Sequence, residues 1–527
     1  TSPVSAGTPA AAAAAPYGPE VAARFPDPPV TYRTPAFQPG RTAFTSNAEL
    51  QALLHGLARD ARPGATAVTL LTLGSSQTGV PLEGLLFTRL PQSDPASVVA
   101  SGRPTVLLVG QQHGDEPAGS EALLVVAQEL AGGRLEPLLD RINVIVLPRA
   151  NPDGARDNRR VTASGIDANR DHLLLKTPEA QAQARLMRDY RPAVVLDSHE
   201  YTVAGRYLEK FGAVQRVDAM LQYAMTANLP AFVTRASEEW FRRPVVERLK
   251  AQGLSSEWYH TTSTDIADKK VSMGGTQPDT ARNVQGLKNA ISLLVETRGV
   301  GLGRLHLKRR VHTHVTAIDS VLHSAADRAA DIAKLRQFVD NEVSAQACQG
   351  DAVLEAAATP SEYMLVLLDP LTGADKPVTV TWDSSLELRT LRLRARPCGY
   401  WLSPAQTDAV LRLRGLGVNV LQLVEEGELR GETYRETARE VGVRSDVRGT
   451  IADADAVLRV TVDTVPALLD VKPGGYYVPL DQPLGNLVFA ALEPDTQNSY
   501  FANRIIGSVA DEARVMARPA MKMAPLP

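Results

Sequence analysis

The chain has 527 residues, of which 44% are hydrophobic and 22% charged, a composition typical of a folded protein with more than one core. Its formal net charge of −3 gives no reason to expect binding to nucleic acid or to an anionic membrane surface. No apolar run approaches the roughly 20 residues of a membrane-spanning helix.

Residues 1–45 are rich in Pro and Ala and are expected to form an arm over the surface. Their opening stretch, 1–15, carries no charge and lacks the basic and apolar regions of a signal peptide. We interpret it as a disordered leader left after processing, which favours a periplasmic or secreted protein. A cytoplasmic protein with a flexible tail is the alternative.

The first predicted elements are a capped helix and a hairpin. Ser46 and Glu49 suit the start of a helix over 46–59. Strands over 67–73 and 82–90 follow, joined by a Gly-containing turn. These elements carry no candidate chemistry.

Polar residues follow the next apolar strand, 105–109, before a helix over 118–130. His113 and Glu116 lie three residues apart in this segment. Ligands bind at the carboxyl edge of open α/β sheets, so both side chains are expected there. An imidazole and a carboxylate at this spacing can bind one zinc ion. Alone, the pair is a weak signal, because an ordinary histidine near a helix start also explains it.

Three more predicted strands end in polar side chains. Strand 141–147 leads into an arginine-rich loop, strand 193–196 is followed by His199, and strand 291–295 is followed by Glu296. The carboxyl ends of neighbouring parallel strands meet at one edge of a sheet, so these side chains are expected to converge. Two histidines and one carboxylate, with a second carboxylate nearby, suit a catalytic zinc with an open position.

The character of the chain changes after about residue 303. A long helix is predicted over 317–347, strands over 363–368, 378–382, 386–395, 418–424, 459–464 and 476–478, and helices over 403–415 and 484–492. No repeat or second set of metal ligands is evident. We predict a second, smaller α/β or α+β domain of unknown role.

Cys348 and Cys398 are the two cysteines of the chain, and both lie outside the candidate site. They can form one disulfide if the protein is exported. Two buried thiols are the other interpretation, and the sequence leaves both open.

The site residues resemble those of a known family. The segments His113-Gly-Asp-Glu116, Asn151-Pro-Asp-Gly154, Gly165-Ile-Asp-Ala-Asn169-Arg170, Ser198-His199 and Glu296 follow the order found in zinc metallocarboxypeptidases of the carboxypeptidase A-like superfamily. The resemblance implies an α/β fold with a mixed, twisted eight-stranded sheet and helices on both faces. The rest of the chain also resembles bacterial members of the family that have a C-terminal extension. We therefore predict three parts, an arm (1–45), a catalytic domain (46–305) and a C-terminal domain (306–527).

The resemblance implies a role for each site residue. His113, Glu116 and His199 would bind one Zn²⁺, Glu296 would be the general base, Arg160 or the adjacent Arg159 would stabilise the oxyanion, and Asn169 and Arg170 would hold the substrate carboxylate. The implied activity is hydrolysis of the C-terminal bond of a peptide substrate. Two alternatives are an amidohydrolase acting on γ-linked or cell-wall (murein) peptides and a non-catalytic binding protein.

One departure from the family concerns the substrate pocket. Many members carry a tyrosine shortly before the catalytic glutamate, whereas residues 273–295 contain none. The loop 274–279 is expected to form part of the specificity wall instead. Asp279 is expected to cap the following helix, and selection of a basic side chain is its alternative role.

Other polar residues have two interpretations each. His312 and His314 alternate as on a strand and could face one metal, although packed histidines are commoner. His172 could support the site or pack in its loop, and Asp197 could orient a ligand or simply end a strand. The segment 258–260 could line the cleft or contribute aromatic rings to the core.

Overall fold

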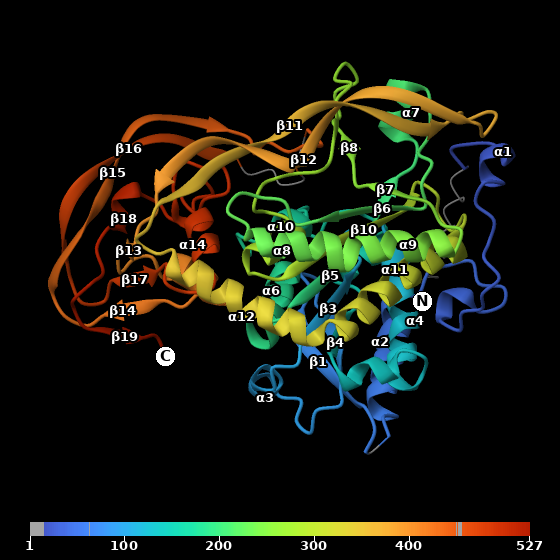
Figure 1. Ribbon diagram of the computed structural model, residues 1–527, viewed down its shortest axis with the longest axis horizontal. Coiled ribbons are helices and arrows are strands. Elements are labelled where there is room, and N and C mark those ends of the chain that lie inside the picture. The colour runs from blue at the N-terminus through green and yellow to red at the C-terminus, as the bar shows by residue number, and fades with distance from the viewer. Residues whose placement is uncertain (1–14, 63, 450, 452–455) are drawn as a thin grey trace, which may run out of the picture.

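The structure is a computed structural model that describes residues 15–62, 64–449, 451 and 456–527. Residues 1–14 of the expected leader therefore lie outside the described residues. Figure 1 shows the main sheet and its helices at the centre, the C-terminal domain on the left and the N-terminal arm on the right.

The main sheet has eight strands, all within residues 64–300, in the order β1-β2-β4-β3-β5-β10-β6-β7. Its strands are β1 (Ala67–Ser75), β2 (Pro81–Thr88), β3 (Thr105–Gly110), β4 (Asn143–Leu147), β5 (Val194–Thr202), β6 (Ala219–Tyr223), β7 (Ser256–Trp258) and β10 (Ile291–Val300). The central strands β4, β3, β5 and β10 are parallel, whereas β1, β2 and β6 introduce antiparallel pairs. The predicted mixed eight-stranded sheet is confirmed.

Helices cover both faces of this sheet. One face carries α2 (Asn47–Arg59), α4 (Ala118–Gly132), α8 (Ala231–Ala236), α9 (Arg243–Ala251), α11 (Leu307–Asp327) and α12 (Ala329–Ala345). The other carries α3 (Pro95–Ala100), α6 (Pro178–Tyr190) and α10 (Ala281–Leu287). Short helical turns are η2 (Glu136–Asp140), α5 (Pro152–Asp157), η3 (Ala168–Arg170), α7 (Gly205–Phe211) and the π-helical η4 (Ser237–Arg242).

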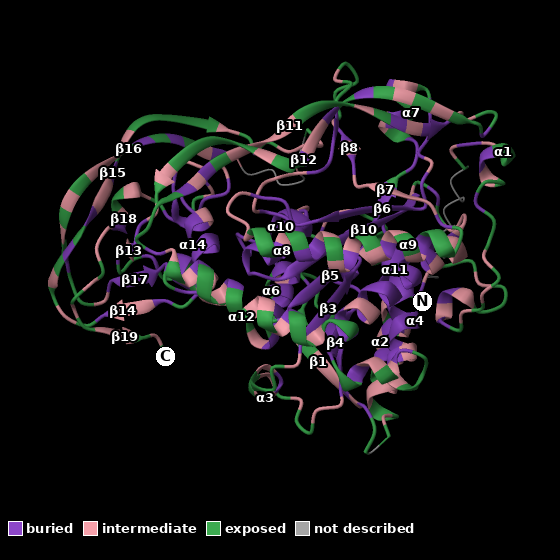
Figure 2. Ribbon diagram, in the orientation of Figure 1, coloured by how far each residue is buried: buried purple, intermediate pink, exposed green. Residues whose placement is uncertain are grey.

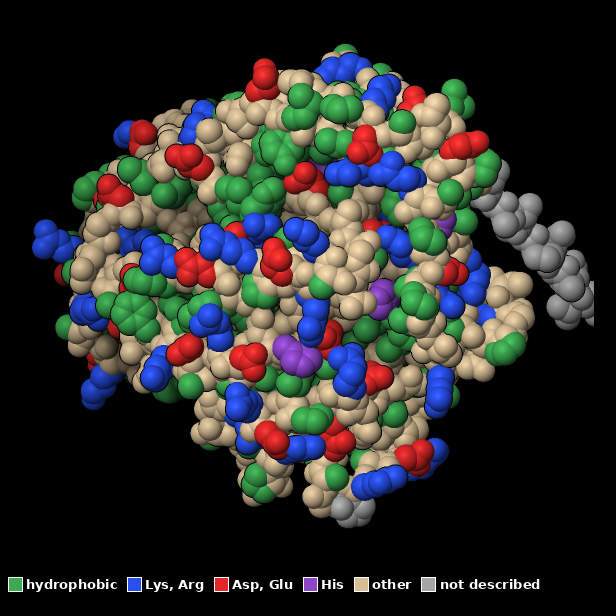
Figure 3. All heavy atoms as spheres, turned by 45° about the vertical axis from the view of Figure 1, so that its right-hand side comes forward, with side chains coloured by type: hydrophobic (Ala, Val, Ile, Leu, Met, Phe, Trp, Pro, Cys, Tyr) green, Lys and Arg blue, Asp and Glu red, His purple; other side chains and the backbone are tan. Residues whose placement is uncertain are grey.

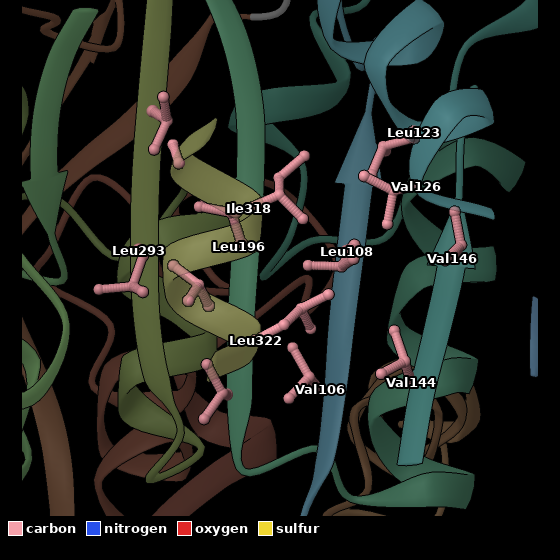
Figure 4. Packing of buried hydrophobic residues seen from close by; sticks show 14 of the residues in the cluster. Val106, Leu108, Leu123, Val126, Val144, Val146, Leu196, Leu293, Ile318 and Leu322 are labelled. Carbon is pink, nitrogen blue, oxygen red and sulfur yellow. The ribbon is translucent and has the colours of Figure 1, made fainter. Parts of the chain in front are cut away.

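The central strands are buried on both faces. Val106 and Leu108 of β3 pack into the larger core, whereas Leu107 and Val109 pack into the core on the opposite face. Figure 4 shows Val106 and Leu108 in one cluster with Ile318 of α11. This two-sided burial explains why the strand sequences are unbroken apolar runs.

Two helices, α11 and α12, replace the single long helix expected over 317–347. The strand suggested by His312 and His314 is wrong, because both residues lie in α11. Val311, Val315 and Ile318 are buried at helical spacing, and this period outweighs the alternation of the histidines. His314 hydrogen-bonds the hydroxyl of Thr297 at 3.0 Å.

The division of the chain at residue 305 remains a prediction. Helix α11, which that division assigns to the C-terminal domain, packs against α4 and β10 of the main sheet. The described part of the arm contains α1 (Pro19–Ala22) and η1 (Pro35–Phe37). Tyr17, Val21 and Phe25 of the arm are buried in a small cluster beside β5.

The C-terminal domain is built on a sheet in the order β16-β15-β18-β13-β17-β14-β19, seven strands among the described residues. They are β13 (Gly399–Leu402), β14 (Leu421–Leu423), β15 (Gly427–Gly442), β16 (Val457–Val471), β17 (Tyr476–Pro479), β18 (Glu512–Val515) and β19 (Met523–Pro525), with α13 (Thr407–Leu416), α14 (Gly485–Leu492) and η5 (Val509–Asp511). The predicted second domain is confirmed, although β13, β15, β18 and β19 were not expected.

A long hairpin connects the two domains. Strands β11 (Asp351–Leu368) and β12 (Asp375–Ala395) form it, and β12 also pairs with β9 (Val271–Ser272), which pairs with β8 (Thr261–Thr262). In Figure 1 the hairpin crosses the top of the view toward α7 and α1. A disulfide joins Cys348, just before β11, to Cys398, just after β12.

The surface shows ordinary charge patterning. Figure 3 shows acidic and basic side chains interspersed over the face in view, in keeping with the small net charge. Figure 2 shows the central strands buried and the outer hairpins β11–β12 and β15–β16 exposed along much of their length. None of the described helices is both long and apolar enough to cross a bilayer.

Candidate metal centre and active site

The loop after β3 places His113 and Glu116 at the carboxyl edge of the sheet. Between them, Gly114 lies so close to a second loop that a Cβ atom there would be 1.9 Å from the carbonyl carbon of Gly154. The Gly114 N–H also donates to the carbonyl of Arg160. The two loops therefore pack tightly only because residue 114 has no side chain.

His113, Glu116 and His199 each offer a ligand atom, and these atoms lie within 4.8 Å of one another. Nδ1 of His113 is 2.6 Å from one Glu116 oxygen, and Nδ1 of His199 is 3.0 Å from the other. All three side chains are buried. Among the described residues, no other His, Cys, Asp or Glu group has this geometry.

A carboxylate holds the outer nitrogen of each histidine. Nε2 of His113 lies 2.9 Å from Asp167, and Nε2 of His199 lies 2.7 Å from Asp197. Such bonds fix the ring orientation and the tautomer, so that Nδ1 faces the shared centre. Asp197 therefore orients a candidate ligand, which was one of its two interpretations. The donor set and its supporting carboxylates fit a zinc ion.

The supporting carboxylates remain charged inside the protein. Burial by itself would raise the pKa of Asp167, but Arg160 and His113 outweigh burial and hold it well below the usual value. His172 belongs to the same network, because it bonds Gln112 at 2.7 Å and Gln112 donates to Asp197. These contacts favour the interpretation that His172 supports the site over the interpretation that it only packs in its loop.

Glu296 lies beside the metal ligands on β10, where its Cα is the register partner of His199 on β5. Its side chain is buried and lines the same cavity as His113 and Glu116. Burial raises the pKa of Glu296 to about 7, and the charge of Glu116 adds to this effect, while His199 opposes it. A carboxylate in this position can accept and return a proton near the metal centre.

Arg160, and not Arg159, faces this cavity. Its guanidinium is 3.0 Å from Asp167 and 3.6 Å from Glu116, whereas Arg159 is exposed. The ion pair with Asp167 fixes a permanent cation beside the metal ligands.

Asn169 and Arg170 lie in η3 and also line the cavity. The side-chain oxygen of Asn169 accepts a hydrogen bond from the N–H of Ala281, and this bond fixes η3 to the start of α10. Nε of Arg170 donates to Asp446 at 2.8 Å, and Nη1 donates to the backbone of Asn169. Asp446 belongs to the C-terminal domain, so the two domains meet at this residue pair.

The cavity has a volume of about 280 Å³ and an uneven distribution of charge. Its polar lining includes His113, Asp115, Glu116, Arg160, Asn169, Arg170, Arg206, Arg282, Glu296 and Arg448, and its apolar side includes Tyr201, Tyr207, Tyr259 and Leu294. A pocket of this size holds about one amino-acid residue with its side chain.

Three further residues line the cavity, and only Tyr259 among them had been given a possible role from the sequence. Tyr259 supplies an aromatic wall, as one interpretation of segment 258–260 allowed, and burial raises its pKa to about 12. Arg282 binds the backbone oxygens of Tyr223 and Gly275. A cation in the first turn of a helix opposes the helix dipole, and this signal could have singled out Arg282. Arg448 comes from the other domain and had no local signal.

The expectation that Asp279 caps α10 is wrong. Thr280 is the N-cap, and its hydroxyl accepts from the N–H of Asn283. Asp279 is buried, and its carboxylate is 3.6 Å from Arg444. Asp279 is held by this interdomain contact, whereas Gly275 and Thr280 of the same segment line the cavity.

A mixed α/β sheet with a buried His₂Glu centre at its carboxyl edge defines a zinc-dependent hydrolase. Residues 58–302 match the family model described as zinc carboxypeptidase. The matched segment therefore carries a zinc carboxypeptidase domain that contains the centre of His113, Glu116 and His199, and the C-terminal sheet domain lies outside it.

Known proteins similar to this chain carry related names. Carboxypeptidase 2 of Trichophyton rubrum is 28% identical over 437 residues, covering 80% of this chain and 78% of that protein. Human Carboxypeptidase D is 36% identical over 126 residues, covering 20% of this chain and 9% of that protein. The solved metallo-carboxypeptidase from Burkholderia cenocepacia has 16% identity and a TM-score of 0.40, covering 54% of this chain and 69% of that chain.

Proposed function

We propose that the chain removes the C-terminal residue of peptides, with Glu296 as general base, Arg160 as oxyanion stabiliser, and Asn169 and Arg170 as carboxylate-binding residues. The single observation that supports this most strongly is that all four line one cavity together with the metal ligands His113 and Glu116.

Zinc held by His113, Glu116 and His199 would lower the pKa of a bound water and polarise the scissile carbonyl. Glu296 takes a proton from the attacking water and passes it to the nitrogen of the departing residue, so that its carboxylate ends as it began. The side chain of Glu296 suits both transfers because burial keeps its pKa near neutrality.

The charge that develops on the carbonyl oxygen needs a fixed donor. Arg160 is held by Asp167 at 3.0 Å and cannot lose its proton at neutral pH, so it supplies that donor without reorganisation. On the other side, Asn169 and Arg170 present an amide and a guanidinium to the terminal carboxylate of the peptide. Anchoring the chain end selects the last peptide bond for cleavage.

The test of these roles is Glu296→Gln. The variant is expected to keep one zinc per chain and lose nearly all turnover of a peptide with a free C-terminus, because the amide accepts no proton. Metal analysis and a hydrolysis assay provide the measurement. Glu247→Gln, at an exposed position on α9, is the matched control and keeps full activity.

Retention of turnover by Glu296→Gln would contradict the role of this residue. The assay also compares ordinary peptides with γ-linked and diaminopimelate-containing peptides. If the protein cleaves only the latter, its function is that of a cell-wall amidohydrolase and not of a general carboxypeptidase. Purified chain that binds no zinc and cleaves none of the peptides would favour a binding protein.

We also infer an exported protein, periplasmic or secreted. The disulfide between Cys348 and Cys398 supports this location, since such bonds persist in oxidising compartments. Thiol titration of denatured, unreduced protein from its natural source is expected to find no free cysteine. Two reactive thiols would support a cytoplasmic location.

A further inference from the structure

Residues 444–448, part of the loop that follows β15, reach from the C-terminal domain into the wall of the active-site cavity. Val447 and Arg448 of this loop line the cavity that also contains Glu116, Arg160 and Arg170. Val447 and Arg448 are therefore part of the site, although they belong to the C-terminal domain and come long after Glu296 in the sequence.

Residues 444–448 of this loop are fixed in place by contacts with the catalytic domain. Asp446 accepts from Nε of Arg170 at 2.8 Å, and Arg444 donates to the backbone oxygen of Arg170 at 3.0 Å. The N–H of Thr264 donates to the carbonyl of Arg448 at 3.1 Å. Its position beside the cavity is thus defined by bonds on both sides of Val447.

Three guanidinium groups converge on this side of the cavity, and two of them have carboxylate partners. Arg160 pairs with Asp167, and Arg170 pairs with Asp446. Among the described residues, no carboxylate lies within ion-pair distance of Arg448. The pKa of Arg448 is lowered, first by the charge of Arg160 and then by burial.

A partly buried cation beside a second cation is unfavourable unless an anion joins them. Two carboxylates on this side of the cavity are already engaged, Glu116 with the histidines and Asp446 with Arg170. A third, Glu296, feels the charge of Arg448, but it makes no ion pair with it and is the proposed general base. In addition, Arg170 has committed Nε to Asp446 and Nη1 to the backbone of Asn169, which leaves it fewer donors for a ligand. The site therefore has an unmatched requirement for one negative group near Arg448.

We propose that Arg448 binds the terminal carboxylate of the peptide together with Arg170, so that the C-terminal domain supplies a substrate-binding residue. This proposal rests on the proposed carboxypeptidase function. Asp446 then acts as a positioning residue, because it holds Arg170 and, through the same loop, presents Arg448.

The test measures binding and not turnover. In the full-length, zinc-loaded Glu296→Gln protein, calorimetry compares one peptide with a free C-terminal carboxylate and the same peptide with a C-terminal amide. Arg448→Gln is expected to weaken binding of the free acid about 10- to 100-fold, the range of a charged hydrogen bond, and to leave the amide unchanged. Arg448→Lys keeps the charge, and its affinity for the free acid is expected to lie between those of the parent protein and of Arg448→Gln.

Arg435→Gln is the matched control, because Arg435 lies on the same hairpin and pairs with Asp463 at the exposed surface. It should bind both peptides like the parent. Equal weakening of acid and amide by Arg448→Gln, or no weakening of either, overturns the proposal, as does a lysine variant no better than the glutamine variant. Hydrolysis by the wild-type chain is measured separately, so its absence counts against the proposed function and not against Arg448.

Discussion

Asp167 and Asp197 determine how the two candidate zinc-binding histidines are oriented. Each carboxylate holds one outer imidazole nitrogen, so the inner nitrogens of His113 and His199 both face Glu116. A histidine without such a partner can rotate and change tautomer, which weakens its bond to a metal. The quality of the zinc site thus depends on residues that never touch the ion.

Asp197→Asn is expected to lower zinc affinity about 10- to 100-fold, because the amide is uncharged and can present a donor to Nε2 of His199. Competition with a chelator of known affinity measures the change. Asp157→Asn is the control, since Asp157 is exposed and pairs with Arg156 at the end of α5. Parental zinc affinity in Asp197→Asn would show that the histidine needs no such support.

Among individual site residues, the sequence predicted those that lie at the end of a strand. His113, His199 and Glu296 each follow or end an apolar run, and the geometry of parallel strands brings them together. Tyr259 had two interpretations from the sequence, and Arg448 had none. Their positions depend on loop paths that local sequence patterns do not determine.

At the scale of single elements, helix α10 has a buried lysine, Lys288, as its C-cap residue. Lys288 follows the last turn of this helix, its side chain is buried, and its Nζ has no hydrogen-bond partner among the described residues. Burial, together with the charge of Arg188, lowers the pKa of Lys288 to about 7. A buried, unpaired ammonium destabilises the folded state.

Lys288→Met is expected to raise the free energy of unfolding by about 1–3 kcal/mol near pH 7. Between pH 7 and the ordinary lysine pKa of 10.5, the unfolded chain binds more protons than the folded one, so wild-type stability rises with pH. The advantage of the methionine variant is therefore largest at or below pH 7 and shrinks toward pH 10.

Denaturant unfolding at pH 6, 7.5 and 9, conditions about one and a half pH units apart, measures this dependence. Lys250→Met is the control, because Lys250 is exposed at the end of α9 and should change neither stability nor its pH slope. A constant difference between Lys288→Met and wild type across these pH values would contradict a titrating lysine.

Element prediction succeeded where one face or both faces of an element are buried. The capping box of Ser46 and Glu49 begins α2 as expected, and the apolar runs of the main sheet became strands. Strand β15 was missed because many of its side chains are exposed charges, so it has no apolar pattern to detect. Its backbone pairs with β16, which contains the predicted strand 459–464, and with β18, which lies far along the chain and was not predicted.

At the scale of the whole molecule, the β11–β12 hairpin is one of the structural links between the domains. Its tip contacts the arm through the ion pair of Arg24 with Asp375, and Lys376 donates to the backbone of α7. The disulfide closes its base, between Cys348 and Cys398, over a sequence separation of 50 residues.

Replacing both cysteines by serine is expected to lower the free energy of unfolding by about 4 kcal/mol, from the loop-closure entropy of the lost cross-link. Urea unfolding of the double variant, compared with oxidised wild type, measures the loss. Addition of reductant should destabilise the wild type to a similar extent and leave the variant unchanged. Identical transition midpoints for the oxidised wild type and the variant would show that the cross-link contributes nothing.

The mixed eight-stranded sheet was accessible through the resemblance of the site segments to a known family, and the second domain through the change in the character of the chain after about residue 303. The contact between Arg170 and Asp446 was not, since no property of either segment indicates the other. Contacts between domains depend on the final docking of surfaces, and a single sequence contains little information about that docking.

The position of Arg448 has a consequence for biosynthesis. The ribosome makes the histidines and Glu296 early and adds the β15–β16 loop much later. A nascent chain that has folded only its first domain would hold metal beside an incomplete pocket, with Arg170 lacking its partner. Full affinity for free peptide C-termini would then be reached only after residues 444–448 have been made and have docked on the first domain.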